Sequence, residues 1–347
     1  MPERILVVAP NWLGDAVMAL PALADVHRAY PRARLIVSAR SSVAPLYSMV
    51  PGVDATIVTR WRGALSDRRT LAEDVQRLVA EQIDLAILLP NSFAAAWMVY
   101  RARVTDRWGY AADFRRPLLT RAVSRPRGSR HQSAYYQHLV GQLGIQKGAL
   151  EPVLTVPVAA VEAARSLLAT RGWQESQPML VVAAGAAYGT AKRWLPTHFA
   201  ALITRAMREA GVQVALVGAP ADAASTRLVL DALGTTERAA VIDLTGATSL
   251  EVLAGVMSLA ASCVSNDSGA MHLAGAVGTP LVALFGPTRE KETAPLTRQG
   301  GRSEVLINQV WCRPCMLREC PFDHQCMTGL RPERVFDSVR LLMGTRR

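Results

Sequence analysis

The chain has 347 residues, more than one hydrophobic core usually serves, so two domains are expected. Half of the residues are hydrophobic and 19% are charged, which excludes an intrinsically disordered chain, and no apolar run is long enough to span a bilayer. The net charge of +11 favours a polyanionic partner such as nucleic acid, an anionic membrane surface or a phosphorylated substrate. The first apolar run is too short for a signal peptide and lacks a cleavage site, so a cytoplasmic protein is expected.

The first half of the chain alternates short apolar runs with helical stretches, which is the pattern of an α/β fold. Strands are predicted at residues 4–10, 34–39, 55–59, 84–90 and 104–109, with helices between them, for example at 67–81 and 93–103. The strand runs are nearly continuous in Val, Ile and Leu, which is typical of strands buried on both faces of a parallel sheet.

A connector at residues 147–157 precedes a second run of the same alternation. The predicted strands there are 179–184, 213–218, 241–244, 262–265 and 281–285, and the predicted helices are 161–171, 196–210, 222–233, 250–259 and a short one from Gly269. We expect two Rossmann-like domains, at residues 1–155 and 156–330, and a C-terminal helix at 331–347 that packs back on the N-terminal domain. In such sheets, ligands bind outside the carboxyl ends of the strands.

The stretch "NWLGDAVMALPAL", residues 11–23, follows the first strand and carries an acid where a nucleotide-binding loop would carry glycines. Gly14 allows a tight turn, and Asp15 stands at the helix start, where the helix dipole favours the ionised carboxylate. Pro21 is expected to kink or delay this helix. An ordinary N-cap role for Asp15 is the alternative to a chemical one.

Two further stretches follow predicted strands of the second half. In "SNDSGAMHLAGAVGTPLVALFGPT", residues 265–288, the backbone N–H groups and dipole at the start of a helix suit a diphosphate, and His272 could add a donor. Helix capping is the alternative for "NDSG". In "GAAYGTAKRW", residues 185–194, Lys192 could neutralise phosphate oxygens, whereas a solvated loop lysine is the alternative.

Together these three stretches resemble the ADP-heptose:lipopolysaccharide heptosyltransferases, and the resemblance extends over nearly the whole chain. It implies the GT-B fold, in which two Rossmann-like domains with parallel sheets face each other across a cleft. The first domain would bind the acceptor and the second the nucleotide sugar. The implied reaction transfers heptose from ADP-heptose, with inversion, to the heptosyl-Kdo2-lipid A inner core of lipopolysaccharide, with no metal and no cofactor.

The resemblance also implies roles for individual residues. Asp15 would be the general base, and Lys192 would stabilise the departing diphosphate. The implied donor-binding residues are Thr190, Lys192, Asp222, Asp267, Ser268, Gly269 and His272. Asp222 is the weakest of these transfers, because the sequence around it diverges from the family. These roles fit the chemistry, since inverting transfer needs a base for the acceptor hydroxyl and positive charge at the leaving group.

The resemblance also implies a partner for the basic residues. They would interact with the phosphates and acidic Kdo sugars of a lipid acceptor in the anionic inner leaflet. Arg60, Arg62 and Arg121 are the candidates for acceptor contact, and peripheral association with the inner membrane is expected. Nucleic acid is not expected as a partner, because the sequence contains no recognisable nucleic-acid-binding motif.

Four cysteines gather near the C-terminus, at Cys312, Cys315, Cys320 and Cys326. Four thiolates would satisfy tetrahedral zinc, but the spacings match no familiar zinc ribbon or finger. Reduced thiols or a local structural cluster are the alternatives, since a cytoplasmic setting argues against stable disulfides.

Other functions stay open on sequence grounds. One is another GT-B enzyme, either a transferase that adds the first or third heptose or a nucleotide-sugar epimerase. The other is a non-catalytic nucleotide-binding protein, which the presence of Asp15, Lys192 and His272 argues against.

Overall fold

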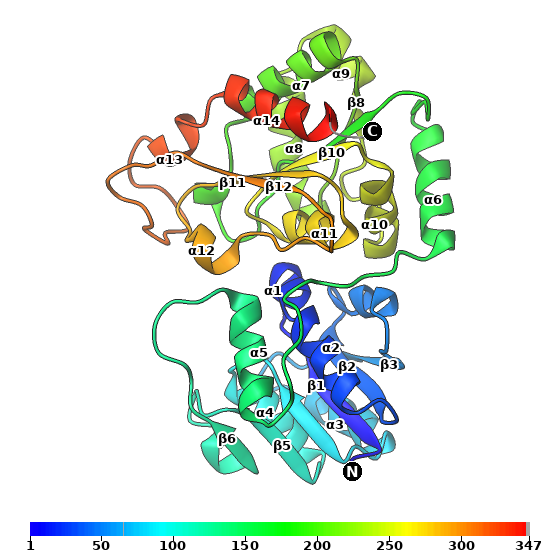
Figure 1. Cartoon of the computed structure of the whole chain (residues 1–347), viewed down its shortest axis with the longest axis vertical. Coiled ribbons are helices and arrows are strands. Elements are labelled where there is room, and N and C mark those ends of the chain that lie inside the picture. The colour runs from blue at the N-terminus through cyan, green and yellow to red at the C-terminus, as the bar shows by residue number, and fades with distance from the viewer. Residues whose placement is uncertain (65, 345–347) are drawn as a thin grey trace. The chain divides into compact units, whose positions relative to one another are not determined.

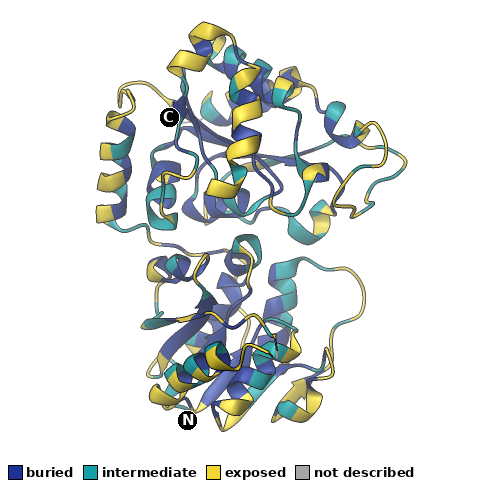
Figure 2. Cartoon of the chain, turned by 180° about the vertical axis from the view of Figure 1, so that it is seen from behind, coloured by how far each residue is buried: buried dark blue, intermediate teal, exposed yellow. Residues whose placement is uncertain are grey.

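The computed structural model describes residues 1–64 and 66–344, and the chain divides into two compact units, Met1–Thr155 and Val156–Arg347. Each unit is an α/β body built on one six-stranded sheet (Figure 1). Strand residues are mostly buried, and the yellow, exposed surface lies chiefly on the outer sides of helices and in loops (Figure 2). The predicted fold class, α/β with two Rossmann-like parallel sheets, is confirmed by this architecture.

The first unit has the strand order β3-β2-β1-β4-β5-β6, and all its pairings are parallel. Its strands are β1 (Arg4–Val8), β2 (Arg34–Arg40), β3 (Ala55–Thr59), β4 (Leu85–Leu88), β5 (Asp106–Tyr110) and β6 (Arg121–Val123). Its helices are α1 (Leu13–Met18), α2 (Leu20–Ala29), α3 (Arg68–Ala80), α4 (Phe93–Arg101) and α5 (Gln132–Gln142). Helices α1 and α2 pack on α5, and α3 packs on α4. Right-handed crossovers place these two groups on opposite faces of the sheet.

The helix that follows β1 is interrupted as Pro21 predicts. Helix α1 ends at Met18, Ala19 lies between the helices, and α2 begins at Leu20 with Pro21 in its first turn. Proline has no N–H to donate to the preceding turn, so a helix tolerates it best at its start.

The second unit has the strand order β12-β11-β10-β7-β8-β9, again with parallel pairings. Its strands are β7 (Met179–Ala183), β8 (Gln213–Leu216), β9 (Ile242–Asp243), β10 (Ser262–Asn266), β11 (Leu281–Phe285) and β12 (Ser303–Ile307). Its helices are α6 (Val158–Ala169), α7 (Pro196–Ala210), α8 (Ala223–Asp231), α9 (Thr235–Ala240), α10 (Leu250–Leu259), α11 (Gly269–Val277), α12 (Glu290–Thr293), α13 (Gln325–Thr328) and α14 (Pro332–Gly344). Single 3₁₀ turns, η3 (Thr190–Lys192) and η4 (Pro220–Asp222), follow β7 and β8.

The position of the last helix, α14, differs from the one predicted from the sequence. We predicted that it packs on the first unit, but α14 packs on α7 and on strands β10 and β11 of its own unit. Val335, Phe336 and Val339 are each at most 1% exposed and belong to the core of the second sheet. Their spacing puts them on one face of the helix, and this face covers the sheet beside α7. Residues 345–347 of the predicted segment lie outside the described residues.

Candidate active site

The carboxyl ends of β7 and β10 lie next to each other, because these two strands pair in the second sheet. The chain leaves β7 through the loop at 184–189 and the turn η3, and it leaves β10 through Asp267 and Ser268 into α11. Two of the stretches singled out from the sequence therefore meet at one sheet edge. This is the edge where open α/β sheets bind ligands.

An ion pair joins these two stretches. The ammonium of Lys192 lies 2.6 Å from Oδ2 of Asp267, and the two side chains are 13% and 5% exposed. The hydroxyl of Thr288, which follows β11, donates to the same oxygen at 2.6 Å. The ammonium also lies 4.8 Å from the centre of the Tyr188 ring. Lys192 is thus held by a largely buried carboxylate and an aromatic face, with part of its surface still accessible.

Asn266, the last residue of β10, fixes the two loops relative to each other. Its buried side chain donates to the carbonyl of Ala184 at 2.8 Å and accepts from the N–H of Trp194 at 3.0 Å. Both ends of the loop that carries Lys192 are therefore tied to β10. Asn266 lies within the motif at residues 265–288, but the sequence alone predicted no role for it.

The start of α11 does not depend on ordinary side-chain capping. Ser268 occupies the N-cap position without a side-chain capping bond, and its hydroxyl lies 3.0 Å from that of Ser265. The carboxylate of Asp267 is engaged with Lys192 and Thr288 instead. Ser268 and Gly269 are half-buried, so backbone N–H groups at this helix start remain within reach of a ligand.

His272 differs from its neighbours in this motif. The sequence suggested that its ring donates to a diphosphate, yet the residue is only 3% exposed. This burial favours a role in packing or positioning over direct contact with a ligand.

Thr190 and Asp222 lie at the same edge of the sheet. Thr190 is exposed at the start of η3. The Asp222 carboxylate accepts the N–H of Ala219 at 3.0 Å and lies against Gly185, where an added Cβ would stand 2.2 Å from the carboxyl carbon. A side chain at position 185 would therefore push the Asp222 carboxylate away from the end of β7.

The segment after β12 supplies a clamp that sequence reasoning missed. The Arg313 side chain, 3% exposed, donates to the carbonyls of Gly286 and Thr288 at 2.5 and 3.1 Å and pairs with Glu290 at 2.9 Å. These contacts fix the turn after β11 that carries Thr288. An arginine in a cysteine-rich segment gives no signal of this role, because its partners are mostly backbone carbonyls.

The four C-terminal cysteines lie close together, but in the described part of the chain they do not have the arrangement of a metal site. All are free thiols, and the pKa of Cys326 is raised to about 11, first by burial and then by the nearby thiols of Cys320, Cys312 and Cys315. Within residues 1–64 and 66–344, no group of three or more histidine, cysteine or acidic side chains is arranged to hold a metal ion. The zinc hypothesis therefore gains no support from this geometry.

In the first unit, Asp15 lies in the first turn of α1, and the N-cap is Trp12. The alternative that Asp15 merely caps the helix is therefore wrong. Asp15 is half-buried. Its charge is the second cause, after burial, of the raised pKa of Tyr136 on α5, so the two side chains face the same region.

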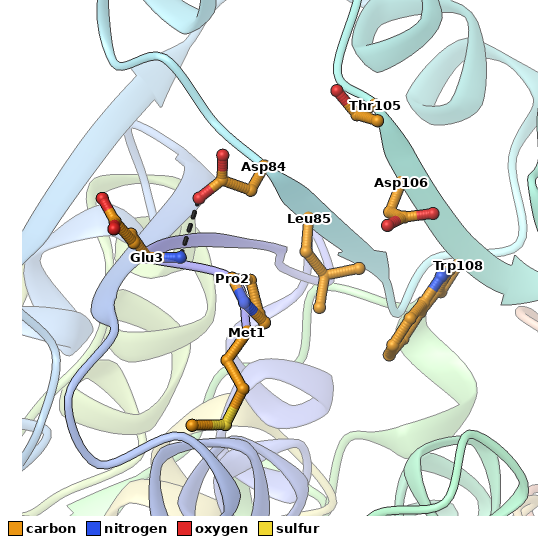
Figure 3. A pocket seen from close by; sticks show the side chains of 8 residues that line it. All are labelled: Met1, Pro2, Glu3, Asp84, Leu85, Thr105, Asp106 and Trp108. Atoms are coloured by element: carbon orange, nitrogen blue, oxygen red, sulfur yellow. Dashed lines mark hydrogen bonds between the residues drawn. The ribbon is translucent and has the colours of Figure 1, made fainter.

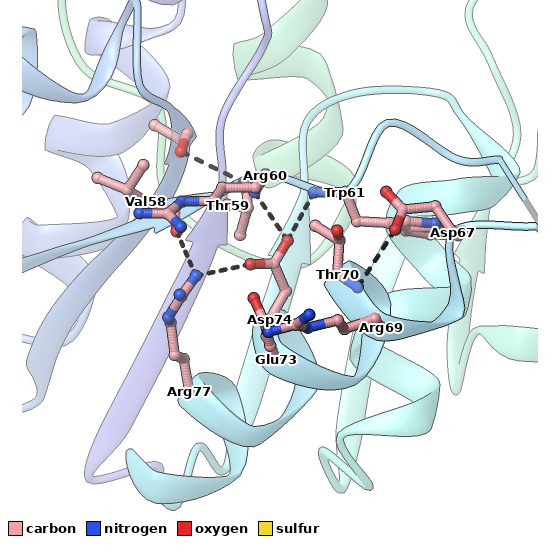
Figure 4. A network of polar contacts seen from close by, with 11 residues as sticks. Val58, Thr59, Arg60, Trp61, Asp67, Arg69, Thr70, Glu73, Asp74 and Arg77 are labelled. Carbon is pink, nitrogen blue, oxygen red and sulfur yellow. Dashed lines mark hydrogen bonds and ion pairs between the residues drawn. The ribbon is translucent and has the colours of Figure 1, made fainter.

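The arginines proposed for acceptor contact fall into two groups. Arg60 and Arg62 are exposed after β3, and buried Asp74 fixes their loop by accepting the N–H groups of Arg60 and Trp61, both at 2.8 Å (Figure 4). Arg121 instead donates to the carbonyls of Leu143 and Gln142 at the end of α5. Its guanidinium is therefore already used to tie β6 to α5.

One surface hollow lies elsewhere and has a structural explanation. It is lined by Met1, Glu3, Asp84, Asp106 and others at the amino ends of the strands, the edge opposite to the one that binds ligands (Figure 3). The Asp84 carboxylate accepts the N–H of Glu3 at 2.8 Å and that of Arg4 at 2.9 Å, so it anchors the start of β1.

Comparison with known proteins identifies the family of this chain. Residues 72–325, more than half of the chain, match the model of glycosyltransferase family 9 (heptosyltransferase). The chain belongs to glycosyltransferase family 9. As a member of this family it is a glycosyltransferase, and the resemblance inferred from the three motifs is confirmed.

Individual relatives of this family 9 glycosyltransferase match it along almost its full length. It is 30% identical over 349 residues to lipopolysaccharide heptosyltransferase 2 of Escherichia coli, with 98% of each chain covered. It is also 30% identical over 367 residues to lipopolysaccharide heptosyltransferase 1 of Pseudomonas aeruginosa, again with 98% of each covered. The solved structure of E. coli ADP-heptose lipopolysaccharide heptosyltransferase II matches it with a TM-score of 0.80, at 27% identity and 98% coverage of each chain.

Proposed function

We propose that this protein transfers heptose from ADP-heptose to the heptosyl-Kdo2-lipid A inner core, with inversion and without a metal ion. The observation that carries the proposal is the ion pair of Lys192 with Asp267 at the carboxyl ends of β7 and β10. It puts a cation beside a helix N-terminus, the arrangement that a nucleoside diphosphate needs. The similarity to heptosyltransferase II supports the choice of sugar.

The second unit would bind the donor. Lys192, the exposed hydroxyl of Thr190 and the N–H groups at the start of α11 would contact the diphosphate, while Asp222 would accept a hydroxyl of the ribose. When the bond between the anomeric carbon and the phosphate oxygen breaks, the electron pair leaves with ADP. Positive charge at Lys192 stabilises the negative charge that develops there.

The first unit would bind the acceptor. An acceptor hydroxyl attacks the anomeric carbon from the face opposite to ADP, and Asp15 takes its proton as the new glycosidic bond forms. Asp15 lies in the first turn of α1, at the end of the first sheet where ligands bind.

Transfer of the first heptose is the second candidate, because the chain is 30% identical to a heptosyltransferase 1 as well as to a heptosyltransferase 2. Incubation with ADP-heptose and each acceptor, followed by mass measurement, separates the two. Gain of one heptose on heptosyl-Kdo2-lipid A, but not on Kdo2-lipid A, is expected. Gain on Kdo2-lipid A alone would replace the proposal by the first-heptose reaction, and absence of ADP release with either would favour a non-catalytic nucleotide-binding protein.

We also infer peripheral association with the cytoplasmic face of the inner membrane. No helix among the described residues is long and apolar enough to cross a bilayer. Helix α4 exposes a ladder of stacked rings, Phe93 on Trp97 and Trp97 on Tyr100, with Arg101 over Trp97 at 5.5 Å. Aromatic and basic side chains together suit an anionic lipid surface. Sedimentation with phosphatidylglycerol vesicles, but not with phosphatidylcholine vesicles, is the expected result.

A further inference from the structure

Arg40 is a basic residue at a strand end to which the sequence analysis gave no role. It is the last residue of β2, at the carboxyl edge of the first sheet. Its Nε donates to Oδ1 of Asn11, at 3.3 Å, in the turn that leads from β1 into α1. Its NH1 nitrogen is buried and has no hydrogen-bond partner among the described residues. A guanidinium placed in this way retains unused donors at the edge where ligands bind.

The charges around Arg40 do not neutralise it. Burial is the largest cause of the lowered pKa of Arg40, and the negative charge of Asp74 acts against it. The positive charge of Arg62 lowers the pKa of Arg40 further, so a second cation lies close by. Asp74 is already engaged, because one oxygen accepts two backbone N–H groups and the other pairs with Arg77 at 2.8 Å (Figure 4). Arg40 and Arg62 therefore lie near each other, and the nearby carboxylate of Asp74 is already bonded to other groups. Buried or half-buried cations of this kind are normally paired.

We propose that Arg40, Arg62 and the side-chain amide of Asn11 form an anion-binding subsite that takes a carboxylate or phosphate of the acceptor. The proposal rests on the proposed function, since it places the subsite in the acceptor-binding unit. Arg40 supplies a planar fork that can meet two oxygens, Arg62 adds charge from an exposed position, and the amide group of Asn11 can donate. Asn11 is four residues before Asp15, so the anion would be bound next to the turn that presents the base.

Steady-state kinetics of Arg40→Gln test the subsite, with Arg34→Gln as the matched control. Arg34 begins the same strand at the opposite edge of the sheet and pairs with Glu81 at the surface. Loss of a charged hydrogen bond to the acceptor should raise the acceptor KM of R40Q by about tenfold or more, with the KM for ADP-heptose unchanged. R34Q should behave as the wild type. Equal acceptor KM values for R40Q and R34Q would overturn the proposal.

Modified acceptors identify the anion. We would compare the native acceptor with one whose Kdo carboxylates are methyl-esterified and with one whose lipid A phosphates are removed. Neutralising the recognised group should raise the wild-type KM and abolish the difference between wild type and R40Q, as expected for two groups that interact. A penalty in R40Q that persists on both modified acceptors would contradict a direct contact.

A binding measurement separates this proposal from the proposed reaction. Calorimetric titration of the deacylated acceptor, without ADP-heptose, should show weaker binding to R40Q and to Arg62→Gln than to wild type. If wild type binds the acceptor but transfers no heptose, the proposed function fails and the subsite stands. If wild type does not bind, or if both variants bind as wild type does, the subsite is wrong. Because Arg62 is exposed, R62Q keeps the test valid should R40Q fail to fold.

Discussion

Lys192 and Asp267 are 75 positions apart in the chain, yet their charged atoms lie 2.6 Å apart at the junction of two neighbouring strands. The carboxylate that holds the ammonium also accepts the Thr288 hydroxyl. This arrangement restrains the lysine, because the carboxylate that holds it is itself fixed by the Thr288 hydroxyl. A diphosphate at this edge would meet a cation that is already in place, which reduces the entropy lost on binding.

Replacement of Lys192 by alanine tests this relationship. We expect weaker binding of ADP-heptose and a fall of about a hundredfold in kcat/KM, because a charged contact to the leaving group is lost. Calorimetry with ADP-heptose and an ADP-release assay measure the two effects. Lys192→Arg should retain part of the affinity, as it keeps the charge. Wild-type affinity and rate in the alanine variant would remove Lys192 from the site.

Asp15→Asn should separate binding from chemistry. The amide is close in size to the carboxylate but is not a base, so transfer should fall by about a hundredfold or more. Affinity for ADP-heptose should stay near normal, since the proposed donor site is in the other unit. Turnover at the wild-type rate would contradict the role of Asp15 as general base.

Thr288→Val should act through the ion pair. The substitution preserves shape but removes the hydroxyl that donates to Asp267, and we expect a several-fold rise in KM for ADP-heptose. Thr279→Val is the matched control, because Thr279 is equally buried and donates to the Met257 carbonyl at 2.6 Å. Each variant should lose about 1 kcal/mol of stability for one hydrogen bond. If both change the donor KM equally, Thr288 has no specific link to the site.

Asp74→Asn should destabilise the first unit by about 2–3 kcal/mol, because a fully buried carboxylate would lose its charge beside Arg77 and some of its hydrogen bonds. Urea unfolding measures the change. Glu73→Gln, next to it in sequence but paired with Arg69 at the surface, should change stability by much less. Equal losses in the two variants would indicate that the Asp74 network contributes little to the fold.

The raised pKa of the Cys326 thiol predicts that the stability of the protein falls at alkaline pH. Its folded pKa of about 11 exceeds the ordinary value, so the unfolded chain loses this proton first as pH rises. The contribution of this thiol to the stability of the folded state is fully present below about pH 8.5, where the thiol is protonated in both the folded and the unfolded state. This contribution is lost as the pH rises towards 11. Cys326→Ala should flatten the decline in melting temperature over this window. A wild-type curve no steeper than that of the variant would argue against the shift.

Patterns of apolar residues predicted the buried strands well, because a strand covered on both faces requires a continuous apolar run. The prediction at residues 281–285 coincides with β11, whose five residues are all buried. Of the four edge strands, β3 and β9 lie at the predicted positions 55–59 and 241–244, whereas β6 and β12 were missed. Each pairs on one side only and includes exposed polar residues, so its sequence lacks that continuity.

The sequence singled out members of the candidate site but not the contacts between them. Lys192 and Asp267 stood out from the sequence, but their pairing depends on β7 lying beside β10, which local patterns do not encode. Thr288 and Arg313 gave no signal, because their role comes from contacts across the chain. His272 was given a ligand role from its position in a motif, whereas its burial depends on how α11 packs.

The interruption at Ala19 has a mechanical consequence. With no N–H at Pro21, the carbonyl of Val17 lacks its usual helical donor, and the six residues of α1 are not continuous with α2. The segment that carries Asp15 is therefore a short helix of its own, which packs on α5 beside α2. Pro21→Ala would restore the missing N–H donor and should join the two helices, which would change the direction in which α1 presents Asp15.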